Sequence, residues 1–347
     1  MSRMTVALML AINLRVIHPE RGIAAILIGM LLLAPAVAFA AEKAEKGSLS
    51  LVLENDLFYN SDRNYTNGVR VSWLSAEDKT PEWALRLADK FPLFPVDKAV
   101  RTSYAVGQNM YTPRDITLRD PPLDDRPYGG WLYGSVGLIA ETGQRLDQLE
   151  LTVGVVGPAS LAEQTQKRVH SIVNADDPRG WDTQLKNEPG FILTYVRSWR
   201  SLIAESLLGI PFDLTPHAGG TLGNVFTYAN AGIMLRYGKN LPLDYGPPRI
   251  QPSVPGSGFF VPRHGFGCYL FAGIDGRAVA RNIFLDGNTF RDSRSVDKEP
   301  LVGDLQFGIA ITWWNLRLGY THVLRTREFK SQDESDNFGA VSLSIRY

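Results

Sequence analysis

The feature that most constrains this fold is a two-residue alternation of apolar and polar side chains. In the run Leu146–Val156, every second residue from 149 to 155 is leucine or valine, and the residues between them are polar or glycine. A period of two is that of a β-strand with two different faces. The run is also about as long as the roughly 9–11 residues that a tilted strand needs to cross a bilayer.

Twelve such runs follow one another along the chain. Two lie within Ser48–Ser75, and the others are Thr102–Met110, Gly129–Glu141, Leu146–Val156, Phe191–Leu202, Phe212–Leu222, Phe226–Tyr237, Phe266–Ala280, Leu301–Trp313, Leu316–Arg327 and Phe338–Tyr347. An even number of runs, abundant aromatic residues and apolar residues at alternate positions back from the terminal Tyr347 are typical of bacterial outer-membrane barrels. We therefore predict an all-β fold, a twelve-stranded antiparallel transmembrane β-barrel with a short extracellular-loop helix. A periplasmic β-sandwich is the alternative, because its strands also alternate.

The N-terminus predicts export. Arginines precede an apolar run over residues 23–39, which ends in a small-x-small sequence at Ala40, the pattern of a secretory signal peptide. We expect residues 1–40 to be this signal peptide and residues 41–347 to be one outer-membrane β-barrel domain. A retained membrane anchor is the alternative, which the charged Glu42 and Lys43 directly after the run disfavour.

Composition excludes several other classes of function. The formal charge is zero and basic clusters are absent, which disfavours nucleic acid as a partner because its binding depends on phosphate neutralisation. Cys268 is the single cysteine, so no internal disulfide can form. The sequence has no H-E-x-x-H zinc motif, no G-x-S-x-G nucleophile motif and no H-x-S triplet, which disfavours zinc chemistry and a serine nucleophile.

The tip between the first two runs is rich in oxygen donors. Glu54, Asn55, Asp56 and Thr66 lie there among further asparagines and aspartates. Carboxylate, amide and hydroxyl oxygens are the ligands that a calcium ion accepts. An ordinary turn is the alternative, since the same residue types favour turns.

Three polar connections are expected to meet at one end of the barrel. In an up-and-down barrel, the connections after strands 1, 3 and 5 lie at the same end. Here they are Asp56–Tyr65, Tyr111–Pro127 and Gly157–Pro189. With the N-terminus in the periplasm, that end faces the cell exterior.

The third connection carries a histidine on a predicted helix. Apolar residues recur at helical spacing between Pro158 and Val173, with His170 on the flank, and Asp176, Asp177 and Asp182 follow. A histidine close to carboxylates and hard oxygen ligands is suited to a metal-assisted hydrolase in which the imidazole activates water. A surface or packing histidine is the alternative.

Several blocks of this sequence resemble one family. The stretches ENDLF, YTNG, MYTPRDI, DRPYGGWLY, VGVVGPASLAEQTQKRVH and GWDTQL, in this order, are similar to the outer-membrane lipid A 3'-O-deacylase family. The resemblance covers essentially the whole chain after residue 40. It implies a twelve-stranded barrel that removes the 3'-linked acyl chains of lipid A, the anchor of lipopolysaccharide, by Ca²⁺-dependent ester hydrolysis. It also implies an active site between the barrel wall and the helix of an extracellular loop.

The resemblance assigns roles to particular residues. It implies that Asp56 holds Ca²⁺ with Asn55, that Thr66 supplies a hydroxyl to the metal or the oxyanion, and that His170 is the general base. Asp176 would orient His170 or complete the metal site, with Asp177 as the alternative acid.

The substrate's phosphates are expected to meet basic residues in the second connection. The family's basic pair has no clear counterpart there, and Arg114 and Arg119 are the candidates. We expect a monomer in the bacterial outer membrane. Two other functions stay open from the sequence, an outer-membrane phospholipase and a non-catalytic porin or structural barrel.

Overall fold

The computed structural model describes residues 47–55, 64–77, 79–96, 99–250, 258–263 and 265–347. The predicted signal peptide over residues 1–40 and the predicted calcium ligand Asp56 lie outside these ranges. For residues 64–66, only the backbone is described.

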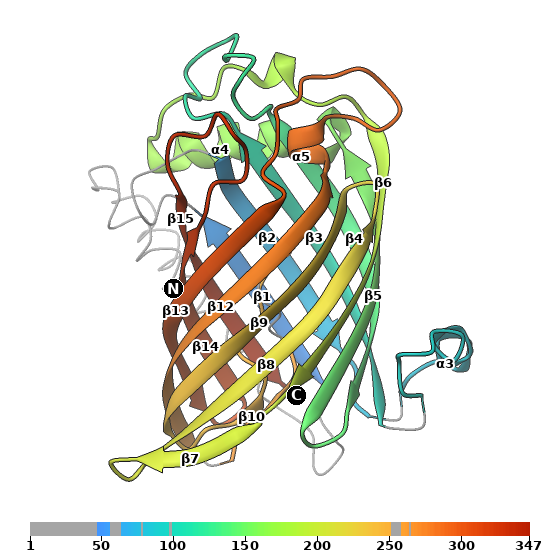
Figure 1. Cartoon of the computed structure of the whole chain (residues 1–347), viewed down its shortest axis with the longest axis vertical. Coiled ribbons are helices and arrows are strands. Elements are labelled where there is room, and N and C mark those ends of the chain that lie inside the picture. The colour runs from blue at the N-terminus through green and yellow to red at the C-terminus, as the bar shows by residue number, and fades with distance from the viewer. Residues whose placement is uncertain (1–46, 56–63, 78, 97–98, 251–257, 264) are drawn as a thin grey trace, which may run out of the picture.

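Within the described residues, twelve strands form one closed antiparallel barrel (Figure 1). The strands are β1 (Ser48–Asn55), β2 (Asn64–Leu74), β3 (Val100–Thr112), β4 (Gly129–Glu141), β5 (Arg145–Val156), β6 (Glu188–Trp199), β8 (Ile210–Gly223), β9 (Phe226–Lys239), β12 (Phe266–Asn282), β13 (Leu301–Trp313), β14 (Leu316–Arg325) and β15 (Asp336–Arg346). The pairing of β1 with β15 and of β6 with β8 closes the barrel. The predicted fold is confirmed, and β7 (Ile203–Leu207) only lengthens the hairpin that leads into β8.

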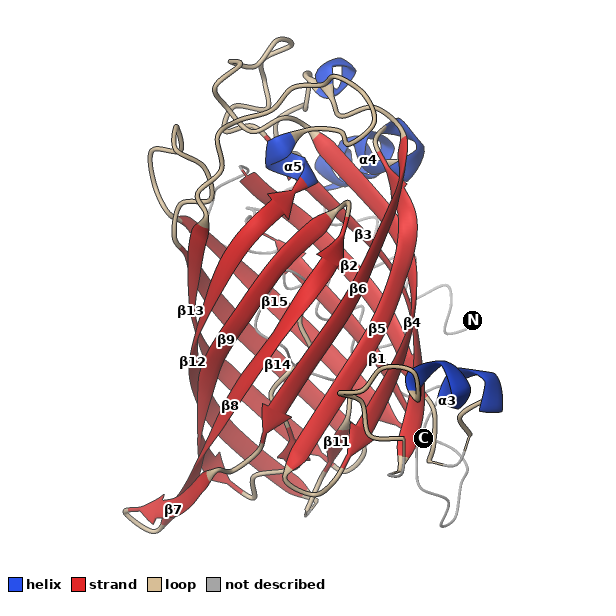
Figure 2. Cartoon of the chain, turned by 45° about the vertical axis from the view of Figure 1, so that its right-hand side comes forward, coloured by secondary structure: helices blue, strands red, loops and turns tan. Residues whose placement is uncertain are grey.

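Within the described residues, the helices are short and lie in the connections (Figure 2). They are α3 (Glu82–Ala88), α4 (Ala162–Val173) and α5 (Ile283–Asp286), with the 3₁₀ turns η3 (Pro158–Ser160) and η4 (Trp181–Thr183). The predicted loop helix over residues 158–173 therefore forms as η3 followed by α4. Among the described residues, no helix is both long and apolar enough to cross a membrane.

The connections separate into two ends. Those after β1, β3, β5, β8, β12 and β14 lie at one end, together with α4 and α5, and we call this the outer end (Figures 1 and 2). The connections after the other strands lie at the opposite, inner end, together with α3 and the β7–β8 hairpin. The predicted grouping of the connections after strands 1, 3 and 5 is thus observed.

The alternation of each strand separates an outward apolar face from an inward polar one. Leu151 and Val153 of β5 are half exposed on the outside, whereas Glu150, the residue before Leu151, points into the lumen and forms an ion pair with Arg70 of β2 at 2.6 Å. This inverted distribution is that of a barrel whose outside meets lipid.

A chain segment between β9 and β12 fills the inner part of the lumen. It contains β10 (Leu243–Asp244) and β11 (Phe260–Val261), which pair with each other. The fully buried Asp244 accepts hydrogen bonds from Arg317 of β14 at 3.0 Å and from the Tyr269 hydroxyl of β12 at 2.8 Å, and it also pairs with Arg236 of β9. Three barrel strands therefore hold this one carboxylate.

A second anchor holds the same segment farther along the lumen. The Arg249 guanidinium donates to Glu54 of β1 at 2.6 Å and to Gln306 of β13 at 3.0 Å. The backbone N–H of Ile250 donates to the same Glu54 carboxylate at 3.0 Å. The alternation pattern does not predict that this segment fills the lumen, because the segment itself has no strand-like period.

The outer part of the lumen is filled by aromatic and aliphatic side chains. Phe284 of α5 is fully buried and stacks on Tyr111 of β3 with 4.0 Å between ring centroids, and Trp131, Phe226 and Val323 belong to the same cluster. Since both parts of the lumen are packed, the porin alternative does not fit this barrel.

A buried ion pair covers the outer cluster. Arg126, at the end of the connection after β3, donates to Glu328, in the connection after β14, at 2.7 Å. Burial alone would raise the pKa of Glu328, but Arg126 and Arg325 together lower that pKa below its ordinary value. Glu328 is therefore ionised over the whole neutral range and ties two outer connections together.

Candidate active site

The helix α4 packs on the outside of the barrel wall at the outer end, against β3 and β4. The chain leaves β5 through Gly157, whose φ of 97° favours glycine, and the Gly157 N–H donates to the Gly130 carbonyl of β4 at 3.0 Å. Gly130 is also where the wall meets the start of the helix, because a Cβ atom there would overlap both Ser160 and Ala162. Gln108 of β3 fixes the same turn by donating to the Ser160 carbonyl at 2.6 Å.

His170 is buried near the end of α4, with 3% of its surface exposed. Its ring Nδ1 lies 2.5 Å from the backbone carbonyl oxygen of Asp176. Because a carbonyl oxygen only accepts, Nδ1 must carry a proton and donate it in this contact. In the neutral imidazole, Nε2 then carries the lone pair, which is the tautomer that a general base requires.

The end of α4 explains how Asp176 reaches the imidazole. Asn174 caps the helix in the left-handed region with a φ of 57°, and the Ala175 N–H donates back to the His170 carbonyl at 3.1 Å. The chain reverses there and brings the Asp176 carbonyl to the ring. Asp176 thus contacts His170 through its main chain, whereas the carboxylates of Asp176 and Asp177 are exposed.

The structure adds Gln166, which the sequence analysis did not single out. Gln166 is buried one helical turn before His170, and its Oε1 accepts a hydrogen bond from Trp181 Nε1 at 2.8 Å. Among the described residues, its buried Nε2 has no hydrogen-bond partner. The spacing of four from His170 places both residues on one helix face, which is the signal that could have found it.

The strand register sets how far the first-hairpin residues lie from this helix. Asn55 pairs with Asn67 of β2, Asn67 pairs with Met110 of β3, and Met110 pairs with Gly130 of β4. Two strand spacings, roughly 10 Å, therefore separate the Asn55 backbone from the strand β3 that α4 contacts. Thr66 lies where the β2–β3 register shifts, between Tyr65 and Asn67.

One of the expected oxygen donors points elsewhere. Glu54 faces the lumen and pairs with Arg249, as described above. It therefore belongs to the lumen packing and not to the tip. Asn55, the next residue along β1, falls on the opposite, outward face, and Asp56 follows it outside the described residues.

The oxygen-rich composition of the rim fits calcium. Asn55 and Asn67 supply amide oxygens, and the carboxylate predicted to hold the ion belongs to Asp56. Within the described ranges, no group of three or more His, Cys, Asp or Glu side chains is arranged to hold a metal ion. Hard oxygen donors without a Cys or His cluster suit Ca²⁺ better than zinc. The calcium site stays a prediction.

Arg114 and Arg119 lie on the connection after β3, at the outer end, and both are exposed. The Arg114 guanidinium pairs with Asp333 of the connection after β14, and the Arg114 backbone N–H donates to Asp125 at 2.8 Å. Arg114 is thus held in position by Asp333 and Asp125, and the side chains of Arg114 and Arg119 are both exposed at the outer end.

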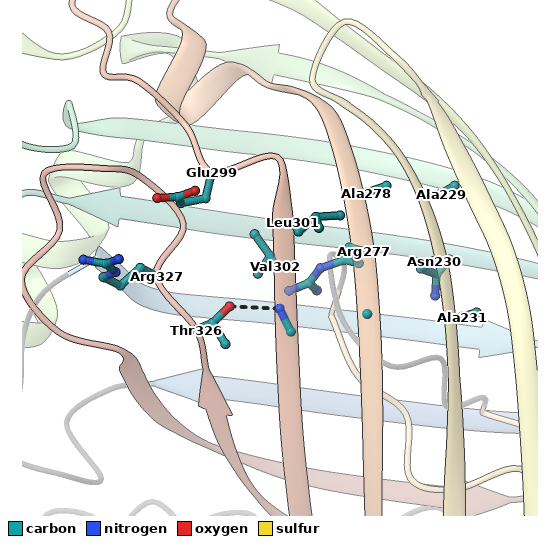
Figure 3. A pocket seen from close by; sticks show the side chains of 12 residues that line it. Ala229, Asn230, Ala231, Arg277, Ala278, Glu299, Leu301, Val302, Thr326 and Arg327 are labelled. Atoms are coloured by element: carbon teal, nitrogen blue, oxygen red, sulfur yellow. Dashed lines mark hydrogen bonds between the residues drawn. The ribbon is translucent and has the colours of Figure 1, made fainter.

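A separate hollow lies on another part of the wall. It measures about 760 Å³ and lies at β9, β12 and β13, where the outward residues Ala229, Ala231, Gly276, Ala278 and Gly303 are small (Figure 3). None of the predicted site residues lines it. The candidate active site is therefore not in this hollow, and it rests on α4 and the rim beside it.

Comparisons with known proteins identify the family and agree with the fold. Residues 25–347 match the family described as outer membrane protein LpxR. LpxR from Salmonella typhimurium has a similar structure, with a TM-score of 0.69 and 19% sequence identity over 86% of this chain and 99% of that one. The β domain of the Bordetella autotransporter BrkA matches at a TM-score of 0.41 and 9% identity, over 88% and 99% of the two chains. No curated protein sequence matches. This chain is therefore an outer-membrane barrel and belongs to the LpxR family, the lipid A 3'-O-deacylase family that its motifs resemble.

Proposed function

We propose that this protein is a calcium-dependent lipid A 3'-O-deacylase, which hydrolyses the 3'-linked acyl ester of lipid A in the outer leaflet. The observation that carries the proposal is the buried His170, whose Nδ1 donates to the Asp176 carbonyl at 2.5 Å. This contact leaves Nε2 as the proton acceptor, on a helix that packs against the outside of the wall.

In the proposed reaction, His170 takes the proton from the attacking water through Nε2. The Asp176 carbonyl holds the ring in place and stabilises the imidazolium that results, because it accepts a hydrogen bond from the Nδ1–H group in both states. Gln166, oriented by Trp181, supplies a buried amide donor to the substrate on the same helix face. Asp56, Asn55 and Thr66 would hold Ca²⁺, with Asp176 as the further ligand. When bound, this ion polarises the ester carbonyl and stabilises the oxyanion.

The position of the helix suits a lipid substrate. Because α4 covers the outward face of β3 and β4 rather than the lumen, an amphiphile reaches it by lateral movement within the outer leaflet. The acyl ester lies near the headgroup level, and the exposed Arg114 and Arg119 above it would attract the phosphates of lipid A. A zwitterionic phospholipid carries no net negative charge, so it would be attracted less strongly than lipid A to these two arginines.

Mass spectrometry of lipid A tests the proposal. Lipid A from cells that express the parent chain should lose the mass of the 3'-linked acyl chains, and cells that express His170→Gln at equal abundance should retain it. A parent chain that leaves lipid A intact and releases fatty acids from phospholipids would instead identify a phospholipase. If both lipid A and phospholipids stay unchanged when Ca²⁺ is supplied, the deacylase and the phospholipase hypotheses are both wrong.

A further inference from the structure

The connection between β2 and β3 forms an arm on the outside of the barrel at the inner end. We define the arm as residues 81–96, which contain α3, and Figures 1 and 2 both show α3 beside the wall and not below the lumen. The arm lies at the opposite end of the barrel from α4 and takes no part in the proposed chemistry.

One face of the arm is packed on the barrel wall. Ala84, Ala88 and Phe94 are buried against the outward Leu138 and Ala140 of β4. Phe91 packs on Tyr195 of β6 with 5.2 Å between ring centroids. The arm is therefore a fixed part of the fold.

Polar contacts fix the same face. The Leu93 carbonyl accepts hydrogen bonds from the Tyr195 hydroxyl at 3.0 Å and from the Arg197 guanidinium at 2.7 Å. Both side chains also donate at 2.6 Å to Asp147, which is fully buried on the outside of β5. These contacts set which residues of the arm face away from the wall.

A second side of the arm, beside the buried face, is apolar and exposed. Trp83, Leu87 and Leu93 have 53%, 59% and 53% of their surfaces exposed, and Trp83 and Leu87 are one helical turn apart. The charges beside them balance, because Arg86 pairs with Glu82 at 3.2 Å. An uncharged, apolar and aromatic face suits a zwitterionic bilayer interface, where no anionic headgroup is needed for binding.

Neighbouring side chains mark the level of the membrane surface. Trp73, Tyr104, Trp199 and Tyr347 lie on the outward face of the strands at this same end, and Trp73 stacks on Tyr104 with 5.6 Å between ring centroids. Such aromatic girdles form at both membrane interfaces of outer-membrane barrels. The arm packs on Tyr195 of β6, four residues before Trp199 along the same outward face, so it lies beside the girdle.

We propose that the arm is a membrane-binding element that inserts Trp83, Leu87 and Leu93 into the headgroup–acyl boundary of the periplasmic leaflet. The occupant of its exposed face is zwitterionic phospholipid. The arm widens the barrel on the side of β4, β5 and β6 and fixes how deeply the barrel sits. The proposal depends on the outer-membrane location and is independent of the enzymatic activity.

Depth-dependent quenching tests the proposal. Cys268 is the single cysteine, so Cys268→Ala allows one fluorescent label to be placed on Leu87→Cys. The matched control is Leu123→Cys, since Leu123 is also an exposed leucine, 74% exposed, but lies in an outer connection. Both labelled barrels are placed in phosphatidylcholine vesicles with nitroxide lipids, and folding is checked by heat-modifiable migration on gels.

The label on Leu87→Cys should be quenched at least twofold more than the label on Leu123→Cys, and more by nitroxides near the headgroup than by nitroxides near the acyl end. Equal, weak quenching of the two labels would overturn the proposal. The unlabelled chain offers a second measurement, in which brominated phosphatidylcholine quenches the parent's tryptophan emission more than that of Trp83→Phe. An equal loss of emission in these two chains would also contradict membrane contact by the arm.

Discussion

Replacing Gly130 by alanine should separate catalysis from barrel assembly. Gly130 faces outward from β4 at the point where η3 and α4 begin, and its missing side chain lets the helix approach the wall. An added Cβ would lie closer than 3.0 Å to both Ser160 Oγ and Ala162 Cβ. Real Cβ atoms essentially never show such distances, and Ala162 has no flexible side chain that could move away.

The size of the effect follows from this overlap. To reach an ordinary contact of 3.4 Å from Ala162, the start of α4 must move from the wall by about 1 Å, a displacement that can cost an enzyme roughly 10²-fold in rate. Overpacking of this kind costs about 1–3 kcal/mol of folding free energy. The destabilisation affects the connection after β5, because the backbone hydrogen bonds that pair β4 with β3 and β5 do not involve the side chain at position 130.

Release of acyl chains from lipid A by purified Gly130→Ala, at saturating Ca²⁺, measures the loss directly. Gly134→Ala is the matched control, since Gly134 lies on the same outward face of β4 and its Cβ would meet only the Ala105 carbonyl oxygen at 3.8 Å. We expect a loss of about 10²-fold for Gly130→Ala, parental activity for Gly134→Ala, and normal heat-modifiable migration for both. Parental activity of Gly130→Ala would refute the reasoning that close packing of α4 on the wall positions His170.

Three further predictions follow from the described contacts and the expected metal. His170→Gln should lower deacylation by about 10²–10⁴-fold without affecting assembly, because the variant lacks the proposed general base; an unchanged rate would make His170 an ordinary helix residue. A strong calcium chelator, or Asp56→Ala, should abolish turnover in a folded barrel, and activity that survives chelation would exclude the metal. Glu328→Gln should destabilise the barrel at neutral pH by about 3–5 kcal/mol, since it leaves Arg126 buried without its anion. Because the pKa of Glu328 is lowered in the folded barrel, the stabilisation that its carboxylate provides is present above the ordinary pKa and disappears as the pH falls through the lowered value. The midpoint of heat-modifiable migration should therefore differ between parent and variant at neutral pH and converge at low pH, and a difference that does not change with pH would contradict this.

The strands were predictable because lipid and lumen impose opposite chemistry on alternate residues. The run Gly129–Glu141 was predicted with the bounds that β4 has, and Leu146–Val156 differs from β5 by one residue. The same alternation, counted along residues 48–54, places Glu54 on one face of its strand with Ser48 and Ser50. The inward direction of Glu54 could therefore have been read from the sequence, and only its partner Arg249, 195 residues away, could not.

The packing of the lumen was not predictable, for a physical reason. Asp244 is held by Arg236, Arg317 and Tyr269, which come from three strands and are spaced by up to 73 residues from it. No local period or motif marks such a set, because its members meet only after the barrel closes. In the site, the spacing of Gln166 and His170 was available from the sequence, whereas the contact of Gln166 with Trp181 depends on how the connection folds back.

The packed lumen and the external helix support one interpretation of where this barrel acts. The lumen is filled by Asp244, which binds two arginines and a tyrosine, and by the aromatic rings stacked below α5. The interior of the barrel therefore contributes to its stability. The outward wall at β3 and β4 is then the surface where a site for a membrane-embedded substrate can form, because lipids diffuse past it and water reaches it from the outer end. In the proposed reaction, a helix fixed there through Gly130 holds the buried imidazole at the boundary between acyl chains and headgroups. The ester of lipid A lies at the same boundary, so in this proposal enzyme and substrate meet without either leaving the membrane.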